Sequence, residues 1–115
     1  RGLRLRAPGV PVIGFPRGAG MFAERFVERT GVEGISLDWS HSYAAGRALQ
    51  RHAAVQGNLD PARLVAGGPQ LLAAVDRILD AFGGGPFIFN LGHGISLETP
   101  IPHVEAVLAR IRERR

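Results

Sequence analysis

His93 stands in the stretch of this sequence that is best suited to chemistry. It follows an apolar run at residues 87–90, which is typical of a buried strand, and it lies between Gly92 and Gly94. Glycine leaves room for a turn and for a ligand that approaches the backbone closely. We therefore expect the imidazole at the carboxyl end of a strand, where ligands bind in α/β proteins.

Three further polar residues could bind or react, and each has a plainer alternative. Asp38 is expected at the end of a strand, where it could serve as an acid or base; we favour a structural role. Asp60 precedes Pro61, a pattern that favours a helix cap over acid–base chemistry. Arg17 lies in a Gly-rich turn and could hold a carboxylate or phosphate, although scaffolding of that loop is the favoured interpretation.

The other histidines and the glycines near residue 18 indicate no cofactor site. His41, His52 and His103 are expected in turns or on exposed helix positions, in contact with solvent, and they lack the spacing of metal ligands. Residues 18–20, Gly-Ala-Gly, do not complete a dinucleotide-binding fingerprint. The sequence has no cysteine, which excludes disulfides, thiolate zinc sites and a thiol nucleophile within these residues.

The composition describes one modest folded domain. The sequence has 115 residues, 45% of them hydrophobic, and no apolar run long enough to cross a membrane. No signal segment opens it, so a cytoplasmic location is the default expectation, although a segment upstream of Arg1 could be missing. The net charge is +4 and every basic side chain is arginine, but no basic run carries interleaved aromatics, so we expect no nucleic-acid partner.

Apolar periodicity divides the chain into four strand–helix units. Ser42, Asp60 and Thr99 are predicted to cap helices, Gly31 to end one, and Trp39 to lie in the core. The N-terminal eight residues are expected to be irregular. Strands are predicted at residues 10–15, 34–39, 53–56 and 87–90, and helices at 21–30, 43–51, 61–65, 71–82 and beyond Pro100.

Strands that alternate with helices predict parallel pairing in an α/β fold. Eight such units close a barrel, and four do not. We therefore interpret residues 1–115 as a single segment that forms the last four units of a (β/α)₈ TIM barrel, a half-barrel. A small, doubly wound open sheet is the alternative.

Several motifs in this order resemble the uroporphyrinogen decarboxylase family. The two most specific are Gly-Asn-Leu-Asp-Pro at 57–61 and Leu-Gly-His-Gly-Ile at 91–95, followed by Thr-Pro at 99–100. Residues 11–15, 37–39 and 78–83 add to the resemblance, which extends from about Pro11 to Arg110.

The resemblance implies a fold, an activity and partners. The family fold is a (β/α)₈ barrel, of which this chain would supply the C-terminal portion. The family enzyme is a carboxy-lyase of porphyrin and haem biosynthesis that converts the four acetate side chains of uroporphyrinogen III to methyl groups, giving coproporphyrinogen III. It needs no cofactor and no metal, and it is commonly a cytoplasmic homodimer.

The resemblance also implies which site residues this segment holds. His93 is expected to bind the tetrapyrrole substrate by donating a hydrogen bond to a carboxylate, aided by backbone N–H groups that the flanking glycines leave open. The family's key Asp, the nearby Arg residues and a substrate-contacting Tyr belong to the first half of the barrel. No catalytic residue is therefore expected here, and the segment alone is expected to be inactive.

Two alternatives remain open at this stage. A corrinoid-dependent methyltransferase of the same superfamily is disfavoured, because those relatives use zinc with Cys ligands and this chain has no cysteine. The other alternative is a non-catalytic half-barrel that acts only by pairing, with a second copy or with a missing first half.

Overall fold

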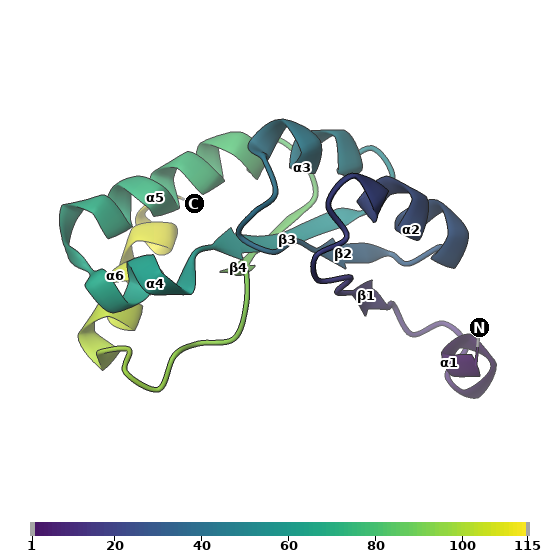
Figure 1. Cartoon of the computed structure of the whole chain (residues 1–115), viewed down its shortest axis with the longest axis horizontal. Coiled ribbons are helices and arrows are strands. Elements are labelled where there is room, and N and C mark those ends of the chain that lie inside the picture. The colour runs from purple at the N-terminus through teal and green to yellow at the C-terminus, as the bar shows by residue number, and fades with distance from the viewer. Residues whose placement is uncertain (1, 115) are drawn as a thin grey trace.

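The computed structural model describes residues 2–114 as an α/β arrangement of four parallel strands that alternate with helices (Figure 1). The sequence predicted this alternation, and it is confirmed. The elements, in order, are α1 (Gly2–Arg6), β1 (Ile13–Gly14), the 3₁₀ helix η1 (Gly20–Phe22), α2 (Ala23–Thr30), β2 (Gly34–Ser36), α3 (Tyr43–Leu49), β3 (Ala54–Leu59), α4 (Pro61–Ala66), α5 (Gly68–Phe82), β4 (Phe87–Leu91) and α6 (Ile101–Glu113).

The strands lie in the sheet in the same order as in the chain. β1 pairs with β2, β2 with β3, and β3 with β4, all in parallel. The register places Ser36 beside Gln56, and Gln56 beside Ile88. A doubly wound sheet instead reverses its strand order at a switch point and carries helices on both faces. The observed order therefore argues against the doubly wound alternative.

Helices cover one face of the sheet and leave the other bare. In Figure 1, α2, α3 and α5 lie above the strands, and α6 packs against α4 and α5. The core lies between these helices and the sheet, where apolar burial stabilises the fold. Its largest fully buried side chains are Phe82, Ile35, Leu37, Leu59, Leu71, Ile78, Val55 and Val75.

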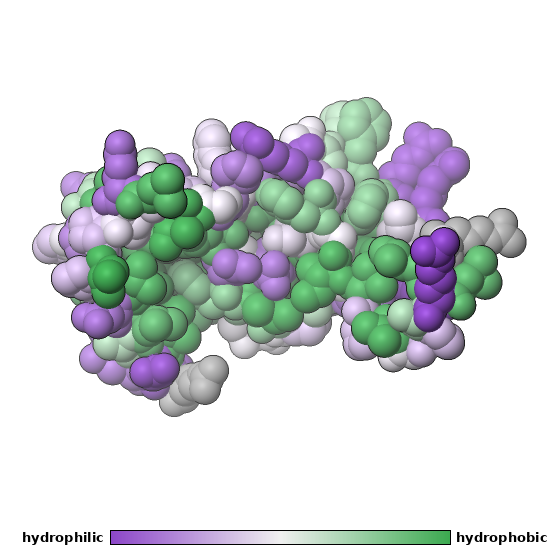
Figure 2. Space-filling model, turned by 90° about the horizontal axis from the view of Figure 1, so that it is seen from below, coloured by the Kyte–Doolittle hydropathy of each residue, from purple (hydrophilic) through white to green (hydrophobic). Residues whose placement is uncertain are grey.

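The opposite face of the sheet, which we call the bare face, carries apolar side chains in contact with solvent. Ile13, Phe15 and Ile88 are 46%, 45% and 44% exposed. Figure 2, which views the molecule from below, shows apolar surface spread across this side. We had predicted buried strands at residues 10–15 and 87–90. The prediction was wrong: alternate side chains point away from the layer of helices and are exposed, and those that face the helices are only partly buried.

Helix ends follow the predicted capping residues with one exception. The Ser42 hydroxyl accepts the N–H of Ala45, and the Asp60 carboxylate accepts the N–H of Ala62. Gly31 ends α2 in the left-handed conformation at φ 63°. The predicted cap at Thr99 was wrong: α6 begins after Pro100 without a side-chain cap, and the buried Thr99 hydroxyl has no partner in the described part of the chain.

Several predicted boundaries were also wrong. Residues 2–6 form a short helix rather than an irregular segment. β3 extends through Leu59 instead of ending at Gln56, because Gly57, Asn58 and Leu59 pair with β4. α5 begins at Gly68, so the break between α4 and α5 is a single residue.

Candidate functional site

His93 lies beside a hollow on the bare face, at the carboxyl ends of the strands. The imidazole is exposed, and no described residue forms a hydrogen bond with it. The Phe15 ring lies beside it, with the ring centroids 6.5 Å apart. The hollow has a volume of about 320 Å³ and is lined by Ile13, Phe15, Ser36, Gln56, Asn90, Leu91, His93 and Gly94.

Polar side chains form a short row across the floor of this hollow. The Gln56 amide nitrogen donates to the Ser36 hydroxyl at 3.2 Å. The Asn90 side chain accepts the N–H of Leu91 at 2.8 Å. The hollow thus offers neutral donors and acceptors, one imidazole and apolar walls, and none of its lining residues is a carboxylate. Such a lining can form hydrogen bonds with polar groups of a ligand while its walls contact apolar parts.

Sequence analysis did not single out Ser36, Gln56 and Asn90. Strand alternation is the signal that could have found them. A polar residue between two core positions of a strand must point its side chain to the opposite face of the sheet. Asn90, for example, lies between Phe89 and Leu91, which pack against the core.

The two glycines beside His93 differ in their surroundings. A Cβ at Gly92 would collide with the backbone nitrogen of Trp39, whereas one at Gly94 would meet nothing within 4 Å. The Gly92 N–H donates to the Leu59 carbonyl at 2.8 Å. We had expected both glycines to leave their N–H groups open to a ligand. That expectation was wrong for Gly92, whose N–H anchors the loop to β3.

Trp39 is not a core residue. It is 55% exposed, and its backbone fits against Gly92. The prediction that Trp39 lies in the core was wrong, because β2 ends at Ser36 and Trp39 belongs to the exposed segment that follows.

The Asp38 carboxylate ties together the loops that follow β1 and β2. One carboxylate oxygen accepts the Gly18 N–H at 3.0 Å, and the other accepts the Ser40 N–H at 2.9 Å and the Ser40 hydroxyl. His41 Nδ1 lies 3.2 Å from the same carboxylate. Asp38 is buried, and all of its partners belong to the protein's own loops, which fits the structural role favoured from the sequence.

The electrostatics of Asp38 follow from these contacts. Burial alone raises the pKa of this carboxyl, but the donors from Ser40 and Gly18, with the nearby His41, hold the pKa well below its usual range. The carboxylate is therefore charged, and it is unsuited to donating a proton.

The remaining predicted side chains have mixed outcomes. His52 is half exposed, as expected. His41 and His103 were wrongly expected in solvent: His41 is 5% exposed against Asp38, and His103 Nδ1 lies 2.8 Å from the Leu64 carbonyl, between α6 and α4. The Arg17 side chain is exposed and has no hydrogen bond to residues 2–114, so its role remains a prediction.

Within residues 2–114 no three metal-binding side chains cluster together. In the same range, the helices are too short or too polar to traverse a bilayer.

Comparison with known proteins gives a consistent result. The family model for uroporphyrinogen decarboxylase (URO-D) matches residues 1–114. The chain is 55% identical over 115 residues to the uroporphyrinogen decarboxylase of Chelativorans sp. (strain BNC1), covering 100% of this chain and 34% of the relative. Identity to the uroporphyrinogen decarboxylase of Mesorhizobium japonicum is 57% over 105 residues, covering 91% of this chain and 31% of the relative.

A third relative agrees. The uroporphyrinogen decarboxylase of Caulobacter vibrioides (strain NA1000 / CB15N) is 54% identical over 110 residues, which cover 96% of this chain and 31% of the relative. The chain thus spans about a third of the length of the curated relatives that it matches.

Proposed function

Because this chain belongs to the uroporphyrinogen decarboxylase family, we propose that the complete protein is a carboxy-lyase that converts uroporphyrinogen III to coproporphyrinogen III. Four acetate side chains would each lose carbon dioxide. The observation that carries the proposal is the match of 54–57% identity with three decarboxylases over more than nine tenths of the chain.

The barrel belongs to the same proposal. The four parallel units would be the last four of a (β/α)₈ barrel, and the bare face would become part of its interior. Supporting this, the strands run in chain order and the helices lie on one face only. The row of Phe15, Ser36, Gln56 and Ile88 would then form a layer inside the barrel, below His93.

The chemistry divides the work between this segment and the rest of the barrel. Loss of carbon dioxide leaves an electron pair, and a protonated pyrrole can take it up. An acid must protonate the ring, and an anion must stabilise the resulting cation. No carboxylate lines the hollow beside His93 in the described chain, and Asp38 is fully engaged by Gly18 and Ser40. The acid and the anion would therefore come from other units of the barrel.

We assign His93 the role of a substrate-binding residue. The substrate carries eight carboxylates, and the imidazole beside the hollow has no partner among the described residues. A hydrogen bond to a charged group contributes about 1.5–3 kcal/mol. No metal or cofactor enters this proposal, and the family resemblance adds a cytoplasmic homodimer, which sedimentation of the complete protein would test.

Activity of the complete protein tests the function. Purified protein should convert uroporphyrinogen III through the heptacarboxylate intermediate to the tetracarboxylate product, whereas the 115-residue chain alone should give no turnover above background. Failure of the complete, folded protein to consume uroporphyrinogen would overturn the proposal.

His93→Asn in the complete protein tests the binding role. We expect kcat/KM to fall roughly ten- to a hundredfold, since about 1.4 kcal/mol corresponds to a factor of ten, while turnover remains measurable. His52→Asn, on the opposite, helix-covered side, is the matched control and should keep wild-type kinetics. Unchanged kinetics for His93→Asn, or total loss of turnover in a folded protein, would each contradict the assigned role.

A further inference from the structure

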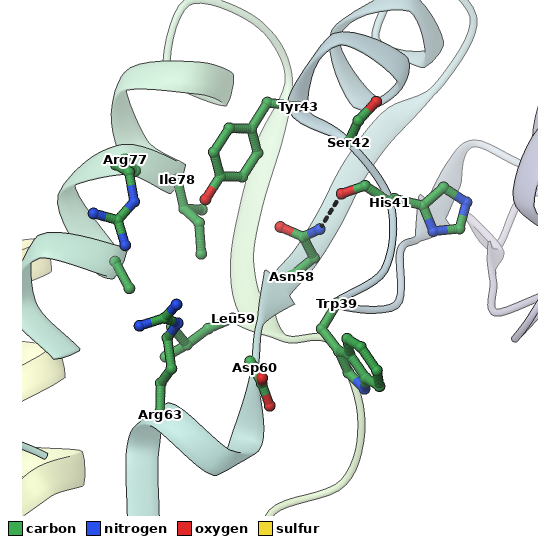
Figure 3. A pocket seen from close by; sticks show the side chains of 11 residues that line it. Trp39, His41, Ser42, Tyr43, Asn58, Leu59, Asp60, Arg63, Arg77 and Ile78 are labelled. Carbon is green, nitrogen blue, oxygen red and sulfur yellow. Dashed lines mark hydrogen bonds between the residues drawn. The ribbon is translucent and has the colours of Figure 1, made fainter. Parts of the chain in front are cut away.

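A second hollow lies behind the sheet and shares no lining residue with the one beside His93. It opens at the carboxyl ends of β2 and β3, between α3, α4 and α5 (Figure 3). Its volume is about 450 Å³. The side chains that matter to the argument are Arg63, Arg77, Tyr43 and Asn58.

Two arginines from different helices share this hollow. Arg63 on α4 and Arg77 on α5 both turn their guanidinium groups toward it (Figure 3). Neither forms an ion pair with any residue in the range 2–114, unlike Arg110, which pairs with Asp76. Asp60 also lines the hollow, but its carboxylate caps α4 by accepting the Ala62 N–H. The two guanidinium charges outnumber the single carboxylate of Asp60, so the hollow is net positive and favours an anionic ligand.

Asn58 supplies a second, independent indication of a ligand. The residue is 5% exposed, and its amide nitrogen donates to the carbonyls of Asp38 and His41, at 3.2 Å each. These two bonds fix the orientation of the amide. Its oxygen is buried and has no partner among the described residues, and Figure 3 shows it turned toward Tyr43 and the arginines. A buried acceptor without a donor is costly, so the ligand should carry a hydrogen-bond donor.

The remaining polar group is the Tyr43 hydroxyl. The Tyr43 ring is held edge-on against Phe82, with centroids 5.8 Å apart. The hydroxyl points into the hollow and makes no hydrogen bond with the described residues. It can donate to an anionic oxygen or accept from a protonated one.

We propose that this hollow binds a phosphate group that carries at least one proton, either free phosphate or a small phosphomonoester. The two guanidinium groups would take the anionic oxygens, and the P–O–H group would donate to the Asn58 oxygen. A sulfate ion has the same shape and carries no proton at neutral pH, so it would leave that acceptor unpaired against an anionic oxygen. The hollow therefore discriminates phosphate from sulfate by one proton.

Calorimetric titration of the complete protein at pH 6 tests the proposal, with ionic strength held constant by chloride. Inorganic phosphate should bind at least tenfold more tightly than sulfate. Arg63→Gln and Arg77→Gln should each weaken phosphate binding about tenfold or more. Arg47→Gln, an exposed arginine on α3 outside the hollow, is the matched control and should bind phosphate like the wild type.

A second arm compares glycerol 3-phosphate with inorganic phosphate, and the tighter of the two identifies the natural class of ligand. Equal binding of phosphate and sulfate, no binding of either phosphate form, or equal loss in Arg47→Gln and the hollow variants would overturn the proposal. Because binding is measured without porphyrinogen, these outcomes are independent of the decarboxylase assay.

Discussion

Gly92 and Gly94 flank the same histidine but carry different constraints. The Gly92 backbone lies against Trp39, and its N–H donates to the Leu59 carbonyl, so this residue holds the His93 loop against β3 and the segment that follows β2. Gly94 faces open space. At the residue scale, the position of the His93 imidazole therefore depends on Gly92 and not on Gly94.

Alanine substitution of each glycine checks this asymmetry. In Gly92→Ala the new methyl group would displace the loop from Trp39, and displacement of a binding group by about 1 Å can reduce catalysis on the order of a hundredfold. Gly94→Ala has space for its methyl group and should retain activity within about twofold of the wild type. The assay is kcat/KM of the complete protein with uroporphyrinogen. Equal losses in the two variants would contradict the role given to Gly92.

Asp38 makes the loops of the site sensitive to acid. Its pKa in the folded protein lies below the ordinary value of about 4, so its hydrogen bonds stabilise the fold fully above that pH and are lost as the pH falls further. Asp38→Asn should lower stability at pH 7, by about 1–3 kcal/mol, and should flatten the loss of stability below pH 4. Urea unfolding at pH 7 and pH 3 measures both effects. A variant with the same acid dependence as the wild type would show that Asp38 is not the group responsible.

At the scale of elements, the α5–α6 contact depends on charge as well as apolar packing. Arg110 on α6 makes two 2.8 Å hydrogen bonds to the Asp76 carboxylate of α5, and Arg114 adds a third at 3.2 Å. The hydrogen bonds from Arg110, opposed by some burial and aided by Arg114, lower the pKa of Asp76 to about 2. The bidentate geometry fixes the angle at which α6 meets α5.

Acid should loosen α6 before the sheet. Because the folded pKa of Asp76 is depressed, its contribution is complete above about pH 4 and is lost as the pH falls toward about 2. Hydrogen exchange of α6 amides should therefore quicken over that range, and Asp76→Asn should show the faster exchange already at pH 7. Glu113→Gln removes only a weaker, exposed contact to Arg110 at 3.3 Å and serves as the control. Identical exchange in Asp76→Asn and wild type would refute the expectation.

Most elements could be predicted from the sequence, because their signals are local. Apolar periodicity locates α5, and the caps at Ser42 and Asp60 need only neighbouring backbone N–H groups. The second half of β3 was missed because Gly57 and Asn58 are poor strand formers, and only their pairing with β4 makes them a strand.

The site shows the same division. The place of His93 followed from its strand and its glycines, both local features. The burial of His41 depends on how the chain turns around Asp38, and the row of Ser36 and Gln56 depends on register between strands. The hollow between Arg63 and Arg77 depends on the packing of two helices. Alternation along each strand could indicate which face Ser36 and Gln56 occupy, but the contacts between strands and between helices need the folded structure.

At the scale of the whole molecule, the strands carry more apolar side chains than a sheet covered by helices on one face can bury. The apolar run at residues 87–89 of β4 is typical of a strand buried on both faces, yet the helices cover only one. Ile13, Phe15 and Ile88 therefore expose apolar area that is suited to contact with other protein surface.

The 115-residue chain alone should self-associate through the bare face. Sedimentation at micromolar concentration should show dimers or larger species, because apolar surface and unpaired strand edges favour association. Ile88→Glu should shift the distribution toward monomer, whereas Leu108→Glu, on α6 and equally exposed at 45% against 44%, should not. A compact, stable wild-type monomer would contradict this expectation.

The order of the strands also bears on how the sheet forms during synthesis. Ile13 pairs with Gly34, Gly34 with Ala54 and Val55 with Phe87, so β2, β3 and β4 each meet a partner that left the ribosome one unit earlier. Among the strands that the structure describes, each pairs with the one before it in the chain, and every connection to be closed contains only one or two helices. The sheet can therefore assemble in the direction of translation, one unit at a time, with each finished edge as the template for the next strand.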